Sequence, residues 1–503
     1  MAREVRLEPV IGIRRRHRLP AFFTGALGFV AATALGWAGC HGEIASADIG
    51  IDAGNTLDAG GDPVPDAGDG DDRQDGSLTD GDGCSDFGAD TAADGGNPMG
   101  NDGGTPPEAC VPLPAASGTI VRVGPSQASQ LREIVRQATA GTTILLEDGL
   151  YRMNGGDDRS RLSFETPGVS LRSASGNPEA VILDGNWVTG ELVSVAASDV
   201  TIAEITVQRA YYHPIHVTGG ASDTRDVRIY RVRVIDPAEQ GIKINPSGGG
   251  TFADRGTVEC CHIELSNAGR SEVRNNCYTG GIDGHQAWGW TVRRNTIRGF
   301  FCGQGLSEHG IHFWTGSRDT LVEENTIIDC ARGIGFGLGE SGATRVYPDN
   351  PYPGAGYIGH YDGMIRNNFV SASAPALFAS EYGFDAGIAL EQARGTRVFH
   401  NTVVSSQAPF SSIEWRFANT QIELKNNLVS HNLRDRGGSA TLAGNIENAP
   451  ATWFASPGAG DLHLAGVTGA QDTGIRLDPG DCDLDIDRQA RDSTPDVGAD
   501  ERR

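Results

Sequence analysis

Two short phrases recur within residues 281–337, and they limit what this chain can fold into. The phrase V-x-x-N-T-I occupies residues 292–297 and again 322–327, and the phrase G-I-x-aromatic occupies residues 310–313 and 333–336. Both phrases alternate apolar and polar residues as a short β-strand does, with glycine and polar residues between them. A strand this short cannot bury its apolar face alone, so the copies must stack on one another. The sequence therefore predicts an all-β solenoid of successive coils.

Aligned copies of the first phrase place one residue of each coil at the same turn. With Asn295 as the reference, the matching residues are Ile205, Val232, Cys261, Asn295, Asn325, Asn367, Asn401 and Asn426. Asparagine side chains stacked at a turn can hydrogen-bond from one coil to the next. We therefore expect an asparagine ladder with a structural role and no part in catalysis.

The second phrase predicts a strand whose isoleucines point into the solenoid. These residues are Ile215, Ile242, Ile282, Ile311, Ile334, Ile388 and Ile413. By alternation the next residue in each coil points outward, and this outward column is His216, Lys243, Asp283, His312, Gly335, Ala389 and Glu414. Parallel coils stack about 4.8 Å apart, so Lys243 should lie between His216 and Asp283. Insertions at 264–280 and 338–386 should form walls beside the column.

The first 115 residues differ in composition from the rest. Basic residues at 14–18, an apolar stretch and the segment Trp37-Ala38-Gly39-Cys40 predict an export signal over residues 1–40. The segment resembles a bacterial lipobox, with Trp37 where leucine is usual, and implies lipidation of Cys40; ordinary signal cleavage of a secreted protein is the alternative. Residues 41–110 hold 17 acidic residues and one arginine, so we expect a disordered acidic linker over 41–115. The prediction is a surface or outer-membrane lipoprotein that contacts the membrane only through its lipid.

Charge outside the linker also limits the choice of partners. The remaining chain is only mildly acidic, which argues against nucleic acid as a partner. The chain contains two lysines, Lys243 and Lys425, so a lysine in the outward column is notable. We expect a monomer.

Both ends of the predicted solenoid resemble a known superfamily. Residues 126–138 predict a helix with Leu131 and Val135 on its apolar face, which Ser126 or Ser129 can cap. This helix and the following G-T-T-I-L-L-x-x-G-x-Y resemble the N-terminal cap of pectin-lyase-like right-handed parallel β-helix proteins. The ending D-x-D-x-x-x-R…D-V-G-A-D-E resembles that of many exported bacterial β-helix proteins, and 496–501 should be structural.

The resemblance covers about residues 118–501. It implies a right-handed parallel β-helix over 116–449, closed by an N-terminal amphipathic helix and followed by a C-terminal cap and tail over 450–503. It implies no single activity, because the superfamily includes lyases, hydrolases, epimerases and non-catalytic surface proteins.

The outward column fits the chemistry of the polysaccharide lyases in this superfamily. In those enzymes a base removes the proton beside a uronate carboxylate, and Ca²⁺ or a cationic side chain neutralises that carboxylate. A lyase of this kind would act by β-elimination on an acidic polysaccharide, and we expect Lys243 as the base, its pKa lowered by partial burial and by His216 and His312. Arg270 or a histidine would neutralise the carboxylate, and His285 shares the outward face of Asp283.

Further residues near the column suggest supporting roles. Asp283 and Glu308 are candidate ligands for Ca²⁺, the one cofactor that we expect. Tyr211, Tyr212, Trp288 and Trp314 are candidate flat surfaces for sugar rings.

Other chemistries remain open. His309 and His312, with Glu308 and His285, suggest a metal site, but residues i and i+3 of a strand face opposite sides, so hydrogen-bonded turn histidines are favoured. Asp283 and Glu308 as paired carboxylates would suit a hydrolase. A non-catalytic glycan-binding or structural surface protein is the main alternative to a lyase.

Nine cysteines in an exported protein suggest disulfides. Cys302 and Cys330 lie on consecutive coils at a similar position and are the predicted pair, and Cys260 or Cys261 with Cys277 is an alternative.

Overall fold

The computed structural model describes residues 110–502, which lie within one compact unit of the chain. The predicted export signal, Cys40 and the linker up to residue 109 lie outside the described residues. No helix within residues 110–502 is long and apolar enough to cross a membrane.

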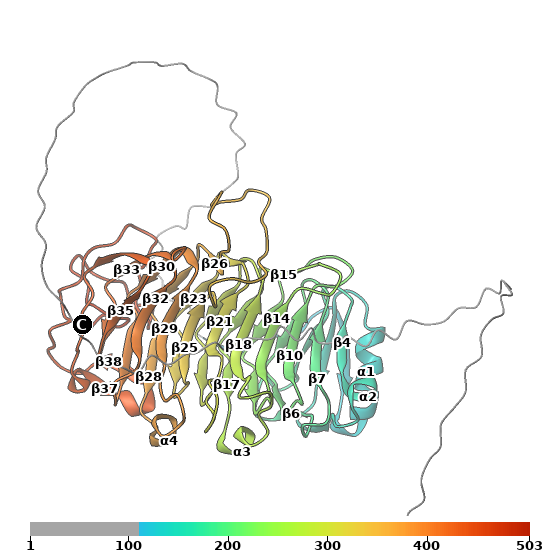
Figure 1. Ribbon diagram of the computed structural model, residues 1–503. Helices are drawn as coiled ribbons and strands as arrows, with labels where there is room; N and C mark the ends of the chain where they lie inside the picture. Colours follow the sequence, from blue (N-terminus) through green and yellow to red (C-terminus); the bar gives the residue numbers. More distant parts are fainter. Residues whose placement is uncertain (1–109, 503) are drawn as a thin grey trace, which may run out of the picture. The chain divides into compact units, whose positions relative to one another are not determined.

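Three parallel sheets run along the described unit, because each coil contributes one short strand to each sheet (Figure 1). The first sheet contains β1 (Thr119–Val123), β2 (Thr142–Leu146), β5 (Ser170–Ser173), β8 (Thr201–Ala203), β12 (Arg228–Tyr230), β16 (Thr257–Glu259), β19 (Thr291–Arg293), β23 (Leu321–Glu323), β27 (Met364–Arg366), β30 (Ala393–Phe399), β33 (Gln421–Lys425), β36 (Ser439–Ala443) and the short β22 (Ser317–Arg318) and β26 (His360–Tyr361). The second sheet contains β3 (Gly149–Arg152), β6 (Val181–Asp184), β9 (Thr206–Gln208), β13 (Arg233–Ile235), β17 (His262–Glu264), β20 (Thr296–Arg298), β24 (Thr326–Ile328), β28 (Phe369–Ala372), β31 (Thr402–Ser405) and β34 (Leu428–Val429). The third, which we call the site sheet, contains β4 (Leu162–Phe164), β7 (Glu191–Val195), β10 (His213–Thr218), β14 (Gln240–Asn245), β18 (Gly280–His285), β21 (His309–Trp314), β25 (Arg332–Phe336), β29 (Ala386–Glu391), β32 (Ser411–Arg416) and β35 (Leu433–Arg436). The predicted all-β solenoid is confirmed.

The core lies inside the coils and is built from stacked apolar side chains. The predicted isoleucine column from Ile215 to Ile413 is fully buried, and its members pair directly from strand to strand. A fully buried isoleucine contributes roughly 1.5–3 kcal/mol of transfer free energy. The coils are therefore held together by a continuous apolar core as well as by their ladder hydrogen bonds.

An asparagine ladder is present, but two of its predicted members are wrong. Its side chains bond in the order Asn295, Asn325, Asn368, Asn401, Asn427 and Asn445, each Nδ2 donating to the next Oδ1 at 2.9–3.0 Å. The residue before each ladder position adopts a left-handed conformation, as Asn367 does with a φ of 51° and Asn426 with 55°. Asparagine tolerates that conformation better than most residues. In each Asn-Asn pair the first residue therefore forms the turn and the second joins the ladder.

The N-terminal end of the solenoid is closed by α1 (Ala128–Gln137), which packs against β4 with Leu131 and Val135 buried. The predicted capping by Ser126 or Ser129 is wrong. A 3₁₀ turn, Pro125–Gln127, leads into α1, and its N-cap is Gln127, which makes no side-chain capping bond.

The C-terminal segment packs against the last coils. It includes 3₁₀ turns at Ala451–Trp453 and Pro457–Ala459 and the antiparallel pair β37 (Phe454–Ser456) and β38 (Asp461–Leu464). The expected structural role of 496–501 is confirmed, because Asp496 accepts backbone hydrogen bonds and Glu501 forms a buried ion pair with Arg491 at 3.1 Å.

Short elements interrupt the coils. These are α2 (Asp157–Ser160), α3 (Asn267–Arg270), α4 (Pro375–Phe378) and the two-stranded pair β11 (Thr224–Arg225) and β15 (Ala253–Asp254).

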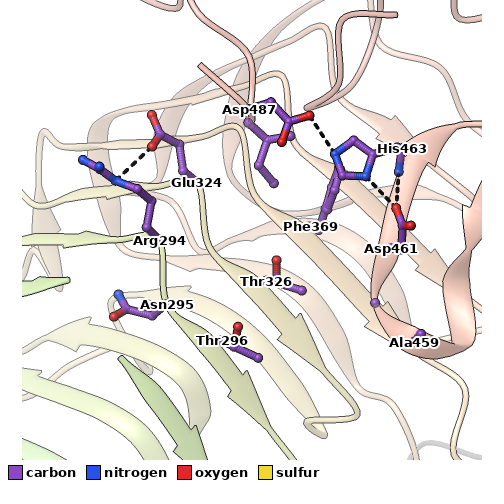
Figure 2. Close-up of a pocket in the computed structure, with 12 residues that line it drawn as sticks. Arg294, Asn295, Thr296, Glu324, Thr326, Phe369, Ala459, Asp461, His463 and Asp487 are labelled. Atoms are coloured by element: carbon purple, nitrogen blue, oxygen red, sulfur yellow. Dashed lines mark hydrogen bonds and ion pairs between the residues drawn. The ribbon is translucent and has the colours of Figure 1, made fainter. Parts of the chain in front are cut away.

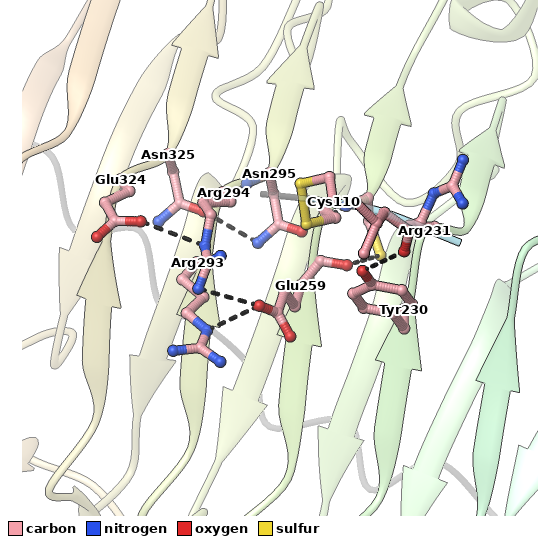
Figure 3. The surroundings of a disulfide bond; sticks show 12 residues. Cys110, Tyr230, Arg231, Glu259, Arg293, Arg294, Asn295, Glu324 and Asn325 are labelled. Carbon is pink, nitrogen blue, oxygen red and sulfur yellow. Dashed lines mark hydrogen bonds and ion pairs between the residues drawn. A yellow bond between two sulfur atoms is a disulfide. The ribbon is translucent and has the colours of Figure 1, made fainter. Parts of the chain in front are cut away.

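Two disulfides differ from the predicted pairing. Cys110 bonds to Cys260 and so ties the start of the described chain to the first sheet (Figure 3). Cys302 bonds to Cys277, and Cys330 is a buried free thiol, so the predicted Cys302–Cys330 bond is wrong. Cys330 lies on the apolar side of its coil. Cys277 lies in the insertion at 264–280, and the spacing of the repeat does not predict where that insertion packs.

Candidate active site

Two columns of side chains run across the strands of the site sheet and face outward. In β21 a Cβ on Gly310 would contact Ile297 and Ile327 inside the solenoid, and the next residue, Ile311, is also fully buried. Two consecutive inward residues place His309 and His312 on the same outward side, with their ring centroids 4.4 Å apart. The expectation that i and i+3 diverge here is therefore wrong, because Gly310 and Ile311 both face inward.

The predicted outward column is confirmed in register. His216 pairs with Lys243, Lys243 with Asp283, and Asp283 with His312 on successive strands. Although they face outward, Lys243, Asp283 and His312 are 8%, 1% and 0% exposed. The wall residue Tyr278, which belongs to the predicted insertion at 264–280, contributes to this cover, because its hydroxyl lies 3.2 Å from Lys243 Nζ.

Lys243 and Asp283 form the centre of a buried polar network. Lys243 Nζ donates to Asp283 Oδ2 at 2.5 Å, to His285 Nε2 at 2.9 Å and to the Tyr278 hydroxyl. Trp314 Nε1 donates to Asp283 Oδ1 at 2.9 Å. All three N–H groups of Lys243 are therefore in use.

This network sets the pKa of Lys243. Burial on its own would lower the pKa of Lys243, but the charge of Asp283 and its hydrogen bond outweigh burial and raise the pKa above its ordinary value. The predicted lowering of this pKa is therefore wrong. Burial and the adjacent Lys243 charge lower the pKa of His285, so that imidazole is neutral at neutral pH.

A second group of residues meets at the start of β14, and its proton acceptor was not predicted. The Glu239 carboxylate is 6% exposed, and Asn275 Nδ2 donates to its Oε1 at 2.6 Å. Burial raises the pKa of Glu239 to about 7, although Lys243, Asn275 and Arg274 oppose the change. His213 Nε2 lies 3.8 Å from Glu239 Oε2, and burial lowers the pKa of His213 to about 3. A carboxylate with a pKa near working pH beside a neutral imidazole is suited to proton transfer.

An arginine with unused donors lies next to Glu239. The backbone N–H of Arg274 donates to the Ala238 carbonyl at 3.1 Å, and its guanidinium lies 3.8 Å from the ring centroid of Tyr211. Its Nε is buried and has no hydrogen-bond partner within residues 110–502. Tyr211 and Tyr212 pack edge to face with centroids 4.6 Å apart, and Tyr212 is partly exposed. The pair thus lies where a sugar bound beside Glu239 would contact it.

Three predicted residues lie elsewhere or are committed to other contacts. The Arg270 guanidinium donates to the Phe301 and Gly299 carbonyls at 2.8 Å and lies over the Phe301 ring, so its predicted role as carboxylate neutraliser is wrong. Trp288 pairs with Arg318 beside the first sheet and donates to Asp319, away from the site sheet. His216 is held between Glu191, at 2.6 Å, and Asn245.

The predicted Ca²⁺ ligands, Asp283 and Glu308, both lie near His312 Nδ1, and Ca²⁺ binding by them stays a prediction. Both oxygens of Asp283 accept hydrogen bonds, Oδ2 from Lys243 and Oδ1 from Trp314. Glu308 instead approaches the histidines of β21, with its Oε2 3.0 Å from His312 Nδ1.

A hollow of about 370 Å³ lies apart from the site sheet, between the second sheet and the C-terminal segment (Figure 2). Its lining includes the Arg294–Glu324 ion pair and His463, whose ring nitrogens contact Asp461 at 2.6 Å and Asp487 at 3.0 Å. These carboxylates raise the pKa of His463 to about 9, so the ring is a cation fixed between two anions. That arrangement links Asp461 to Asp487 within the C-terminal segment.

Neither Glu239 nor Arg274 lies in the outward column that the repeat predicts. Glu239 precedes the strand that carries Lys243, and Arg274 lies four residues after Arg270 in the insertion. The excess length of that insertion was the available signal, because long loops beside a repeat commonly carry function.

Comparison with known proteins agrees with this architecture. The sequence profile of the family described as "Right handed beta helix region" matches residues 193–429, which contain both outward columns from His213 to Glu414. The chain has the right-handed parallel β-helix fold that this family model describes. A search of curated proteins finds no match to the sequence.

Several solved structures are similar to this chain at low sequence identity. The pectate lyase Pel9A is 13% identical with a TM-score of 0.47, over 77% of this chain and 97% of the lyase. PfbA, a surface adhesin of Streptococcus pneumoniae, is 11% identical with a TM-score of 0.40, over 64% and 87%. An alginate lyase from Paenibacillus sp. str. FPU-7 is 12% identical with a TM-score of 0.36, over 66% and 99%. At these identities the likeness concerns the fold.

Proposed function

We propose that this β-helix protein cleaves an acidic, uronate-containing polysaccharide by β-elimination on the outer face of the site sheet. The observation that carries the proposal is the meeting of Glu239 with Arg274, which places a tuned proton acceptor next to a guanidinium with a free N–H. Tyr211 and Tyr212 lie beside them and can bind the flat faces of sugars.

The proposed roles follow from the charges of the two groups. Arg274 pairs with the uronate carboxylate and so favours negative charge developing at the adjacent carbon. The Glu239 carboxylate takes the proton from that carbon, the C–O bond to the next sugar breaks, and a C=C bond forms. The leaving oxygen takes a proton from water, and Glu239 later returns its proton to water. A carboxylate with a pKa of about 7 is a stronger base than an ordinary one and is still substantially ionised at neutral pH.

Lys243 is assigned a positioning role in this mechanism. Its ammonium holds Asp283 and His285, and its charge opposes the rise in the Glu239 pKa. The earlier prediction that Lys243 is the base is replaced, because a lysine held in its charged form by Asp283 cannot readily accept a proton.

A non-catalytic glycan-binding role is the second candidate. It is favoured by the partly exposed Tyr212 beside the Tyr211–Arg274 stack, which would bind an acidic sugar without any proton transfer. The proposed lipid anchor on Cys40 would serve either role by holding the protein at the cell surface.

End-group analysis of the products distinguishes these functions. The full chain is incubated with pectate, alginate and chondroitin, and the fragments are examined by mass spectrometry. β-Elimination leaves one new end lighter by one water than hydrolysis would. Fragments with saturated ends would indicate a hydrolase, and binding without fragments would favour the adhesive role; both results would contradict the proposal.

A further inference from the structure

Three buried side chains on β21 and the turn before it direct ligand atoms at one point. Glu308 Oε2 lies 3.0 Å from His312 Nδ1 and 4.0 Å from His309 Nδ1. The three ligand atoms that these residues offer all lie within 4.8 Å of one another. Ligand atoms about 2.0–2.2 Å from one metal ion stand roughly 3–4 Å apart, so this spacing is close to that of a metal site.

The same three side chains are buried, and the ring nitrogens of His309 have no hydrogen-bond partner. Glu308, His309 and His312 are 8%, 3% and 0% exposed. Within residues 110–502, both ring nitrogens of His309 lack a hydrogen-bond partner, and Glu308 Oε2 and His312 Nδ1 meet only each other, 3.0 Å apart. Buried polar atoms without partners are uncommon and costly, so a missing ligand is a direct explanation for several of them at one point.

The orientation of His312 also fits a ligand. Its Nε2 donates to the Gly337 carbonyl at 3.1 Å, and its Nδ1 faces Glu308 Oε2 at 3.0 Å. Metal-binding histidines commonly donate their other ring N–H to a carbonyl or carboxylate, which fixes the ring and its tautomer.

Space for the His309 ring is provided by Gly335 on the neighbouring strand. A Cβ at residue 335 would lie 2.6 Å from His309 Nε2 and 2.7 Å from Cδ2 and Cε1. Gly335 pairs with His312 in register, so the two histidines can lie together only because the next coil has no side chain there.

We propose that Glu308, His309 and His312 bind a divalent transition metal ion. Two imidazole nitrogens and one carboxylate suit Zn²⁺, Co²⁺ or Fe²⁺ and leave coordination positions open. Ca²⁺ takes oxygen ligands and is disfavoured by this donor set. The proposal goes beyond polysaccharide cleavage and does not depend on it, because the site is assigned from its own donors.

Direct metal binding tests the site without reference to activity. The full chain, freed of metal with a chelator and then dialysed, is titrated with Zn²⁺ by calorimetry, with Ca²⁺ as a parallel titrant. X-ray absorption of the Zn²⁺-loaded native protein counts imidazole ligands and needs no substitution. The variants Glu308→Gln and His309→Asn are titrated with His463→Asn as the matched control, because His463, Asp487 and Asp500 form the other candidate donor cluster in the described chain.

We expect one Zn²⁺ per chain with two imidazole ligands, and affinity at least about tenfold weaker in both β21 variants but unchanged in His463→Asn. Where a variant fails to fold, the ligand count of the native protein decides the matter. The proposal is overturned if the native protein binds no Zn²⁺, if its bound Zn²⁺ lacks two imidazoles, or if Ca²⁺ competes with Zn²⁺ for the site. It is also overturned if only His463→Asn loses the metal; the Glu308–His312 contact is then an ion pair and nothing more.

Discussion

The ring of His309 lies over Gly335 so closely that a Cβ on residue 335 would stand 2.6 Å from His309 Nε2. One glycine in the outward column thus makes room for a histidine of the preceding coil. In the sequence Gly335 is the first residue of the outward column without a polar side chain. In the structure its missing side chain leaves the space that the His309 ring occupies.

Gly335→Ala should therefore destabilise the protein and displace His309. Overpacking of this kind costs roughly 1–3 kcal/mol, which urea unfolding would detect. Gly248→Ala is the matched control, because a Cβ there meets nothing within 4 Å. Equal unfolding free energies for the two variants would show that the His309 ring can move aside freely.

Each ladder asparagine should contribute to the free energy of unfolding in proportion to how deeply it is buried. Asn325 accepts from the backbone and side chain of Asn295 and donates to the Val292 and Glu323 carbonyls. Asn325→Ala leaves several buried groups unpaired, and we expect a loss of roughly 2–4 kcal/mol. Asn445→Ala, at the less buried end of the ladder, should cost clearly less in the same urea titration. The reverse order would mean that the ladder does not hold the coils.

The Cys277–Cys302 disulfide should hold the Tyr278 wall over Lys243. It closes a loop with a sequence separation of 25 residues, and such a closure stabilises by about 3 kcal/mol in the chain-entropy description. Replacing both cysteines with serine should lower the unfolding free energy by about this amount and speed amide exchange near Tyr278. Cys330→Ser changes a buried free thiol and serves as the control for wall mobility. Unchanged exchange at Tyr278 in the double variant would count against the tether.

The raised pKa of Glu239 makes stability depend on pH. Its ordinary pKa is 4.5 and its folded value is about 7, so between these values the folded protein keeps a proton that the unfolded chain releases. The contribution of Glu239 to the free energy of unfolding is therefore fully present below about pH 4.5. It falls as the pH rises to about 7 and is lost above that. The contribution is roughly 3 kcal/mol at most. Glu239→Gln should flatten this part of the urea-unfolding profile, and superimposable profiles for wild type and variant would show that Glu239 titrates normally.

The sequence determines the coils and the outward column because both depend on a repeat. His216, Lys243, Asp283 and His312 pair as expected, since register follows from counting residues along parallel strands. The shift from Asn367 to Asn368 arises where two asparagines adjoin and either can be counted. Backbone conformation, which spacing does not reveal, selects the second.

The proposed chemistry was less predictable because it depends on loops. Arg274, Tyr278 and Cys277 belong to an insertion whose path is fixed by contacts far along the chain, such as Arg274 with Tyr211. The pKa of Lys243 also depends on geometry: histidines alone could have surrounded it, but a carboxylate, Asp283, contacts its ammonium as well. Two consecutive inward residues at Gly310 and Ile311 likewise bring His309 and His312 together against simple alternation.

The ultraviolet absorbance of unsaturated uronate ends tests the proposed elimination most directly. Wild type and Glu239→Gln are compared on pectate, alginate and chondroitin, with Glu423→Gln on the first sheet as the control. The mechanism predicts that absorbance rises with wild type and the control on at least one polymer, faster as pH increases through about 7, and that Glu239→Gln loses roughly a hundredfold or more of this rate while still binding the polymer. No absorbance change on any polymer, or an unaltered rate in Glu239→Gln, would contradict it.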